Sequence, residues 1–186
     1  MSISKHDSIL LIGFMGSGKS TVGRILAETI KKSFIDLDDK IVSLSSHSSV
    51  YSIIKKEGEL FFRDLEEKAL SSCILEKYGV IALGGGALVW KSDTKILDTK
   101  KSLNKNKVIV IYLETPFNVC KKRVENELIE KKISTRPLFE DPLKAENLYK
   151  ERIERYQKLA DIKIRTSDKT PGEIADTICK QISQLL

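Results

Sequence analysis

Histidine and cysteine are scarce in this sequence, and both shortages limit the chemistry that it can carry. Only two histidines occur, His6 and His47, and each lies in a terminal or serine-rich stretch. A mechanism that uses histidine as acid or base therefore has little to draw on. The three cysteines, Cys73, Cys120 and Cys179, lie far apart without a C-x-x-C pair. They are predicted to be reduced structural thiols, neither a disulfide set nor metal ligands.

Long apolar runs and flexible linkers are also missing. No apolar run approaches the roughly 18 residues needed to span a bilayer, and residues 1–8 lack the apolar centre of a secretory signal. No long linker rich in glycine, proline or serine divides the chain, and it has no evident internal repeat. Disorder and repeat architectures are therefore disfavoured, and a cytoplasmic protein without a membrane partner is expected.

The length and charge of the chain narrow the choice further. At 186 residues it fits one α/β domain with a sizeable core. Its formal net charge of +6 would suit nucleic acid, a membrane surface or a small polyanionic substrate. The basic residues are spread along the chain, and dense runs such as Lys121-Lys122-Arg123 contain no interleaved aromatic residues. A small anionic substrate is therefore favoured over nucleic acid.

The clearest motif is Gly13-Phe14-Met15-Gly16-Ser17-Gly18-Lys19-Ser20-Thr21, which matches G-x-x-x-x-G-K-[ST] at every fixed position. An apolar run at 8–13 precedes it, as expected for a strand covered on both faces, and a helical pattern over 20–32 follows. Residues 16–21 are predicted to bind nucleotide phosphates, because a glycine turn points its amides inward and the helix N-terminus attracts anions. Lys19 adds a charge for the β- and γ-phosphates, and the Ser20 hydroxyl is placed to ligate Mg²⁺.

Two carboxylates, Asp36 and Asp38, end the next apolar run, a short predicted strand over 33–37. Open α/β sheets bind ligands at this end of their strands. If the strand continued, both side chains would project from one face, because they are two residues apart. Asp36 is predicted on the Mg²⁺ side, and Asp38 is predicted to orient or deprotonate an acceptor hydroxyl. The alternative, that this run caps a helix beginning near Lys40, is favoured only for Asp39.

Further along, Gly58, Glu59, Phe62, Arg63 and Glu66 form the pattern Gly-Glu-x-x-Phe-Arg-x-x-Glu on a helical stretch. Together with the phosphate loop and Asp-x-Asp, this pattern closely resembles shikimate kinase. The resemblance covers nearly the whole chain, and its motifs occur in the same order. It implies the α/β P-loop kinase fold, with three αβα layers, a central five-stranded parallel sheet and a mobile lid.

The remaining motifs concern the acceptor and the lid. A buried run at 80–83 leads into Gly84-Gly85-Gly86, where backbone amides can approach a ligand closely, although a plain tight turn is an alternative. Arg136-Pro137-Leu138 and the Arg-x-x-x-Tyr from Arg152 to Tyr156 are similar to the family's lid and to its carboxylate-gripping helix. The resemblance thus implies Asp38, Arg63, Gly84, Gly85, Gly86 and Arg152 as shikimate-binding, Arg123 and Arg136 as nucleotide-binding, and Lys19, Asp38 and Arg136 as catalytic.

The remaining sequence predicts the domain organisation. Strands are expected at 107–113 and 162–165, and helices from Pro116, over 143–159 and over 171–185. Residues 127–142 lack helical periodicity and are rich in basic residues, which favours a lid. We expect a single domain whose core comprises 1–42, 78–126 and 143–186, with a substrate-binding helical segment at about 43–77 and a lid at about 127–142.

The function implied by the resemblance is ATP- and Mg²⁺-dependent phosphorylation of the shikimate 3-hydroxyl by a monomer that binds no nucleic acid. Val42 stands where the family usually has Glu, residues 43–49 are unusually rich in serine, and the segment before Arg136 is longer. This length leaves open whether Arg123 stacks on adenine. A kinase of a sugar acid or nucleoside monophosphate would differ only on the acceptor side. A nucleotide-binding regulator without turnover would have no need of Asp38, Arg63 and Arg152.

Overall fold

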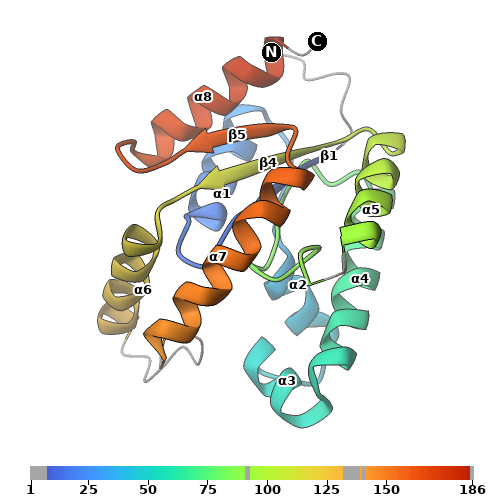
Figure 1. Cartoon of the computed structure of the whole chain (residues 1–186). Helices are drawn as coiled ribbons and strands as arrows, with labels where there is room; N and C mark the ends of the chain where they lie inside the picture. The colour runs from blue at the N-terminus through green and yellow to red at the C-terminus, as the bar shows by residue number, and fades with distance from the viewer. Residues whose placement is uncertain (1–7, 91–92, 132–138, 140, 185–186) are drawn as a thin grey trace.

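A parallel β-sheet of five strands forms the centre of the computed structural model, which describes residues 8–90, 93–131, 139 and 141–184. The strand order is β2-β3-β1-β4-β5, and every pairing is parallel. The strands are β1 (Ser8–Ile12), β2 (Phe34–Asp36), β3 (Val80–Ala82), β4 (Val108–Glu114) and β5 (Ile162–Arg165). This confirms the predicted α/β class and the five-stranded parallel sheet (Figure 1).

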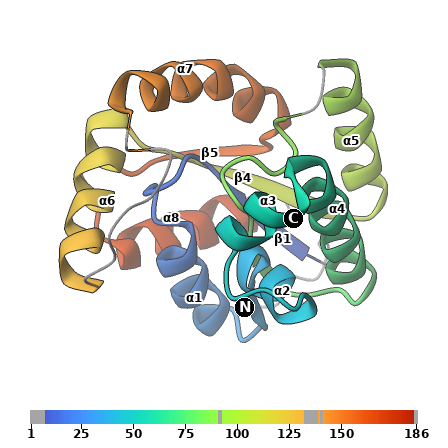
Figure 2. The same cartoon turned by 90° about the horizontal axis from the view of Figure 1, so that it is seen from below.

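Helices cover both faces of the sheet, so the described chain has the three predicted layers. They are α1 (Lys19–Thr29), α2 (Leu37–Leu44), α3 (Val50–Glu57), α4 (Glu59–Leu75), α5 (Asp93–Lys105), α6 (Phe117–Lys131), α7 (Pro142–Leu159) and α8 (Pro171–Gln184). Figures 1 and 2 show α7 and α8 on opposite sides of β4 and β5. In Figure 1, α3 projects away from the sheet, beside one end of α4.

Alternate residues of β1 belong to two separate hydrophobic clusters. Ile9 and Leu11 pack with residues of α1 and α8, whereas Leu10 and Ile12 pack with residues of α2, α4, α5 and α7. Successive side chains of a strand point to opposite faces, so a strand covered on both faces must be apolar at every position. This explains the unbroken apolar run that predicted β1.

The carboxyl ends of β1, β2 and β3 lie at the same edge of the sheet, because the three strands are adjacent and parallel. Three loops or turns leave this edge: the phosphate loop after β1, the turn at Asp36 after β2, and the glycine loop Gly84–Gly86 after β3. The strand order alone therefore brings together the motifs that the sequence places far apart.

Three features of the secondary structure differ from the predictions. Strand β2 ends at Asp36 and α2 begins at Leu37, so the strand does not persist to Asp38. Helix α5 covers a stretch for which no element was predicted. Helix α6 continues to Lys131, so the first five residues of the predicted lid segment, 127–131, are helical. Residues 132–138 and 140, Arg136 among them, lie outside the described residues.

The serine-rich stretch and Val42 have structural roles. The Ser49 hydroxyl accepts a hydrogen bond from the Ser52 amide, and Ser52 Oγ in turn accepts one from the Ser49 amide, which forms a capping box at the start of α3. Val42 is partly buried against the cluster that includes α2 and α4. These departures from the family pattern therefore act on packing and helix initiation.

Candidate active site

The phosphate loop connects β1 to the first turn of α1. Gly16 and Gly18 have φ angles of 79° and 92°, which favour glycine, and the Ser17 amide donates to the Phe14 carbonyl at 3.1 Å. No side chain caps the N-terminus of α1 at Gly18 within the described chain. The amides of its first turn are therefore available to an anion, as the positive end of a helix requires for phosphate binding.

Lys19 lies folded over this loop. Its Nζ donates hydrogen bonds to the carbonyl oxygens of Gly13 at 2.9 Å and Phe14 at 3.0 Å. Burial lowers the pKa of Lys19 to about 8, although the carboxylates of Asp38 and Asp36 favour its charged form. An incoming phosphate would add negative charge beside this ammonium group and so favour its charged form further.

Asp36 joins the phosphate loop to the acceptor side. Its Oδ2 accepts a hydrogen bond from the Ser20 hydroxyl at 2.5 Å, and its Oδ1 accepts one from the Asp38 amide at 3.1 Å. The second bond caps α2, so Asp38 is held in the first helical turn, and the continued strand on which the two carboxylates would have shared a face does not form. The capping role was assigned to the wrong residue, because Asp36 and not Asp39 provides it.

The pair Ser20 and Asp36 fits Mg²⁺, which prefers hydroxyl and carboxylate oxygens and commonly keeps several waters. No group of three or more His, Cys, Asp or Glu residues in the described part of the chain could hold a metal ion. A bound Mg²⁺ would therefore take most of its ligands from the nucleotide and from water, as in other phosphate-loop enzymes.

Asp38 lies against the first glycine of the Gly84–Gly86 loop. A methyl group on Gly84 would stand 2.6 Å from Asp38 Oδ1, so any side chain at position 84 would displace this carboxyl group. Oδ1 is buried and has no hydrogen-bond partner among the described residues. Burial and the neighbouring Asp36 raise the pKa of Asp38, while Lys19 and Arg63 partly offset the shift. A carboxylate whose pKa is raised in this way is a better proton acceptor than an ordinary aspartate.

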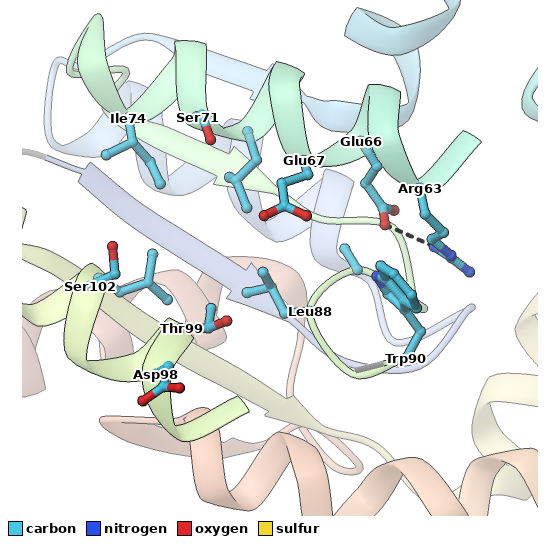
Figure 3. Close-up of a pocket in the computed structure, with 13 residues that line it drawn as sticks. Arg63, Glu66, Glu67, Ser71, Ile74, Leu88, Trp90, Asp98, Thr99 and Ser102 are labelled. Carbon is cyan, nitrogen blue, oxygen red and sulfur yellow. Dashed lines mark hydrogen bonds and ion pairs between the residues drawn. The ribbon is translucent and has the colours of Figure 1, made fainter. Parts of the chain in front are cut away.

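Arg63 lies against the third glycine. A methyl group on Gly86 would stand 2.6 Å from Arg63 Nη2. The side chain extends from α4, is only 8% exposed, and donates to Glu66 at 2.8 Å and to Glu59 at 3.1 Å. Burial raises the pKa of Glu66 above its usual value, and the nearby Arg63 offsets part of this shift. Figure 3 shows this ion pair beside Trp90.

Arg152 reaches the second glycine from the opposite helix. It extends from α7, and its Nη1 donates to the Gly85 carbonyl at 2.9 Å. Each glycine of the loop therefore adjoins a different predicted acceptor residue: Asp38 at Gly84, Arg152 at Gly85 and Arg63 at Gly86. Two guanidinium groups, which suit carboxylates geometrically, and one carboxylate with a raised pKa thus surround a single backbone segment.

The predicted nucleotide residues divide into three cases. Arg123 of α6 lies at the phosphate loop, where its Nη1 is 3.4 Å from the carbonyl oxygens of both Gly16 and Ser17. Thr21 is exposed on the first turn of α1. Arg136 lies outside the described residues, so its predicted role stays a prediction.

Several neighbours of the site were missed by the sequence reasoning. The Tyr156 hydroxyl donates to the Gly85 carbonyl, and Arg155 Nη1 donates to the Val89 carbonyl at 2.7 Å. A cavity of about 270 Å³ extends from Arg63 and Glu66 between α4 and α5, with Trp90 in its wall (Figure 3). Tyr156 lies in the Arg-x-x-x-Tyr pattern, so the sequence did contain a signal for this residue. The cavity depends on α5, which was not predicted.

The phosphate loop, its buried lysine and the adjoining hydroxyl and carboxylate define a kinase of the P-loop class. A family model described as shikimate kinase matches residues 15–183, which is most of the chain. The chain therefore belongs to the shikimate kinase family, whose members phosphorylate shikimate with ATP and Mg²⁺.

Individual relatives agree with this family. A shikimate kinase of Sulfurihydrogenibium sp. (strain YO3AOP1) is 33% identical over 95% of this chain and 98% of its own length. That of Caldanaerobacter subterraneus subsp. tengcongensis is 37% identical over 96% and 97%. A solved shikimate kinase from Acinetobacter baumannii, in complex with shikimate, has a TM-score of 0.82 and 30% identity and covers 98% of this chain and 96% of that one. A gluconokinase from Sinorhizobium meliloti 1021, at 16% identity and a TM-score of 0.57, shares the fold alone.

Proposed function

We propose that the chain transfers the γ-phosphoryl group of ATP to the 3-hydroxyl of shikimate, which yields shikimate 3-phosphate and ADP. One observation supports this most directly. The three consecutive glycines after β3 bring Asp38, Arg152 and Arg63 around one backbone segment, next to the phosphate loop. A carboxylated hydroxy acid offers a partner for each of these groups, because its carboxylate suits the guanidinium groups and its hydroxyl suits Asp38.

On the donor side, the amides of residues 16–21 hold the phosphates, and Lys19 leaves the carbonyls of Gly13 and Phe14 to bind the β- and γ-phosphates. Ser20 and Asp36 would hold Mg²⁺, Asp36 through water. When bound, the ion would supply positive charge for the phosphates. Arg123 contributes positive charge beside Gly16 and Ser17.

On the acceptor side, Asp38 accepts the proton of the shikimate 3-hydroxyl as its oxygen forms the new bond to the γ-phosphorus. The bond between that phosphorus and the β,γ-bridging oxygen breaks, and ADP leaves with the electron pair. Arg63 and Arg152 hold the carboxylate, and the amides of Gly85 and Gly86 complete the acceptor site. Catalysis then depends on positioning and charge neutralisation, which dominate phosphoryl transfer.

The wider organisation belongs to the same proposal. Residues 43–77 form the acceptor-binding helical segment, and residues 127–142 form a lid that starts within the end of α6 and supplies Arg136 to the phosphates. We also propose a monomer that acts in the cytoplasm, where three free cysteines are compatible with a reducing environment. None of the helices in the described ranges combines the length and apolar character that a bilayer crossing requires.

An ADP-release assay with a panel of acceptors tests this function. The panel contains shikimate, its carboxamide analogue, gluconate as a sugar acid, and AMP as a nucleoside monophosphate. We expect ADP release with shikimate at a kcat/KM at least about 10²-fold above that with the carboxamide, because a site built for charged partners rejects an acceptor that leaves them unpaired. Gluconate and AMP carry anionic groups of their own and test the two other acceptor classes, and both should be poorer acceptors than shikimate. Equal turnover of gluconate or AMP would replace shikimate in the proposal.

A further inference from the structure

One backbone carbonyl in the acceptor site receives two hydrogen bonds from the same helix. Arg152 Nη1 donates to the Gly85 carbonyl at 2.9 Å, and the hydroxyl of Tyr156, one turn further along α7, donates to the same oxygen. The Tyr156 ring is fully buried and stacks on Tyr112 with ring centroids 5.2 Å apart. Burial also raises the pKa of Tyr156, so its hydroxyl remains protonated, and a donor, at neutral pH.

The Gly85 carbonyl and the Gly86 amide belong to one planar peptide unit. No cis peptide occurs in the described chain, so the C=O and N–H of this unit point in opposite directions. Holding the carbonyl toward Tyr156 and Arg152 therefore directs the Gly86 N–H away from them. Because glycine lies on both sides of this peptide, side-chain sterics do little to prevent the plane from rotating. The orientation of the Gly86 amide therefore depends on what holds the Gly85 carbonyl.

A substrate carboxylate would compete with that carbonyl for Arg152. A carboxylate is the stronger acceptor for a guanidinium group, so Arg152 is expected to leave Gly85 when it grips the acceptor. The Tyr156 hydroxyl, which also lies within hydrogen-bond reach of Arg152, would then be the remaining donor to Gly85. Resting on the proposed function, we propose that Tyr156 is a positioning residue, which keeps the Gly85–Gly86 peptide oriented for shikimate after Arg152 has turned to the carboxylate.

The test compares two Tyr→Phe variants on α7. Tyr156→Phe removes the hydroxyl but keeps the ring that stacks on Tyr112. Tyr149→Phe is the matched control, because it also removes a hydroxyl that donates to a backbone carbonyl, that of Thr115 at 2.9 Å, which lies outside the glycine loop. Steady-state constants for shikimate and ATP, the melting temperature and direct shikimate binding are measured for both variants. The chain's single tryptophan, Trp90, lies beside Arg63 and serves as the fluorescence probe, with calorimetry as a second measurement of shikimate binding.

We expect Tyr156→Phe to raise the KM and the dissociation constant for shikimate by about three- to tenfold, the range expected for one ordinary hydrogen bond. The ATP KM should stay within about twofold of wild type, and the melting temperature should change no more than in Tyr149→Phe, since each loses one such bond. Shikimate constants that equal those of Tyr149→Phe would overturn the positioning role. A wild-type enzyme without shikimate-dependent ADP release would instead refute the proposed function itself, so the two failures are distinguishable.

Discussion

The Ser20 hydroxyl donates a hydrogen bond of 2.5 Å to Asp36 Oδ2, and this contact joins the first turn of α1 to the end of β2. The other oxygen of the same carboxylate caps α2 through the Asp38 amide. Asp36 thus fixes both the hydroxyl proposed to bind Mg²⁺ and the helical turn that carries the proposed base. Substitution of Asp36 should therefore weaken the binding of Mg²⁺ more than the binding of nucleotide or shikimate.

Asp36→Asn is therefore expected to raise the Mg²⁺ concentration for half-maximal activity by about tenfold or more, since partners just outside the metal's ligand shell typically contribute that much to affinity. An amide can still cap α2, so the fold should be retained. Initial rates are measured against Mg²⁺ at saturating ATP and shikimate. Asp39→Asn is the control, because Asp39 is exposed on the same helix and should leave the Mg²⁺ dependence unchanged. An unaltered Mg²⁺ requirement in Asp36→Asn would contradict the proposed metal site.

Lys19 should take up a proton when nucleotide binds. Its pKa of about 8 in the free protein means that the amine loses its charge as the pH rises through that value. Bound phosphates favour the charged form, so ATP affinity should fall above about pH 8, and binding there should consume protons. Calorimetry in buffers with different ionisation enthalpies measures this uptake. Lys19→Ala should lack it and should lose at least about 10²-fold in kcat. Proton-neutral binding at pH 8 in the wild type would argue against a phosphate role for Lys19.

The sequence predicts the layers of this fold better than its turns. Strands β1 and β4 are covered on both faces, and this burial gives apolar runs that a reader can recognise in the sequence. Helix α5 has no such pattern in the sequence, because its buried residues Ile96 and Leu103 stand in a stretch that is mostly polar. The turn after Asp36 was predicted wrongly, since a side-chain cap competes with strand continuation and periodicity does not report it.

The candidate site was predictable in its members but not in its contacts. The motifs identify Asp38, Arg63 and Arg152, yet nothing in their spacing shows that each adjoins a different glycine of one loop. That arrangement depends on β2 and β3 being neighbours and on α7 packing against β4, both of which are tertiary facts. The hydroxyl of Tyr156 is a further case, because its role depends on one carbonyl 71 residues away.

Asp38→Asn tests the proposed base. The variant is nearly isosteric but cannot accept the proton, so kcat should fall by about 10²- to 10⁴-fold while the dissociation constant for ATP changes little. The wild-type kcat/KM for shikimate should also fall as the pH falls, at a pH above the ordinary aspartate range, because the pKa of Asp38 is raised and its ionised form is required. Rate and nucleotide-binding measurements on the same samples separate the two effects. Equal losses in kcat and in ATP affinity would indicate that Asp38 binds the metal instead.

The two arginines should determine which acceptor is used. Arg63→Ala and Arg152→Ala each leave a desolvated carboxylate with one guanidinium group, a loss on the order of 2–5 kcal/mol for a buried pair. The KM for shikimate should rise accordingly, and the KM for ATP should barely change. Arg165→Ala is a suitable control, because the Arg165 side chain is 89% exposed and pairs with Glu114. If wild-type enzyme phosphorylated the carboxamide analogue as readily as shikimate, the carboxylate site would be misassigned.

Glu66 and Glu59 offer a matched comparison, because both bind the guanidinium of Arg63 but differ in exposure. The Glu66 side chain is 5% exposed and lies 2.8 Å from Arg63, whereas Glu59 is 65% exposed and lies 3.1 Å away. Exposed ion pairs contribute little, so Glu59→Gln should change the shikimate KM by less than about threefold. Glu66→Gln removes the buried, charge-assisted bond that fixes Arg63, and the shikimate KM should rise by about tenfold.

The pH dependence of stability distinguishes Glu66 in a second way. Its pKa in the folded state is raised above the ordinary value of 4.5, so in the pH window above 4.5 the folded state binds more protons than the unfolded state. The contribution of this group to stability therefore decreases as the pH rises through that window. Glu66→Gln has no such titration, so between about pH 5 and pH 7 its melting temperature should decline less, or rise more, than that of the wild type. Glu59→Gln should follow the wild-type profile. Parallel profiles for Glu66→Gln and wild type would mean that the pKa of Glu66 is not raised in the folded state.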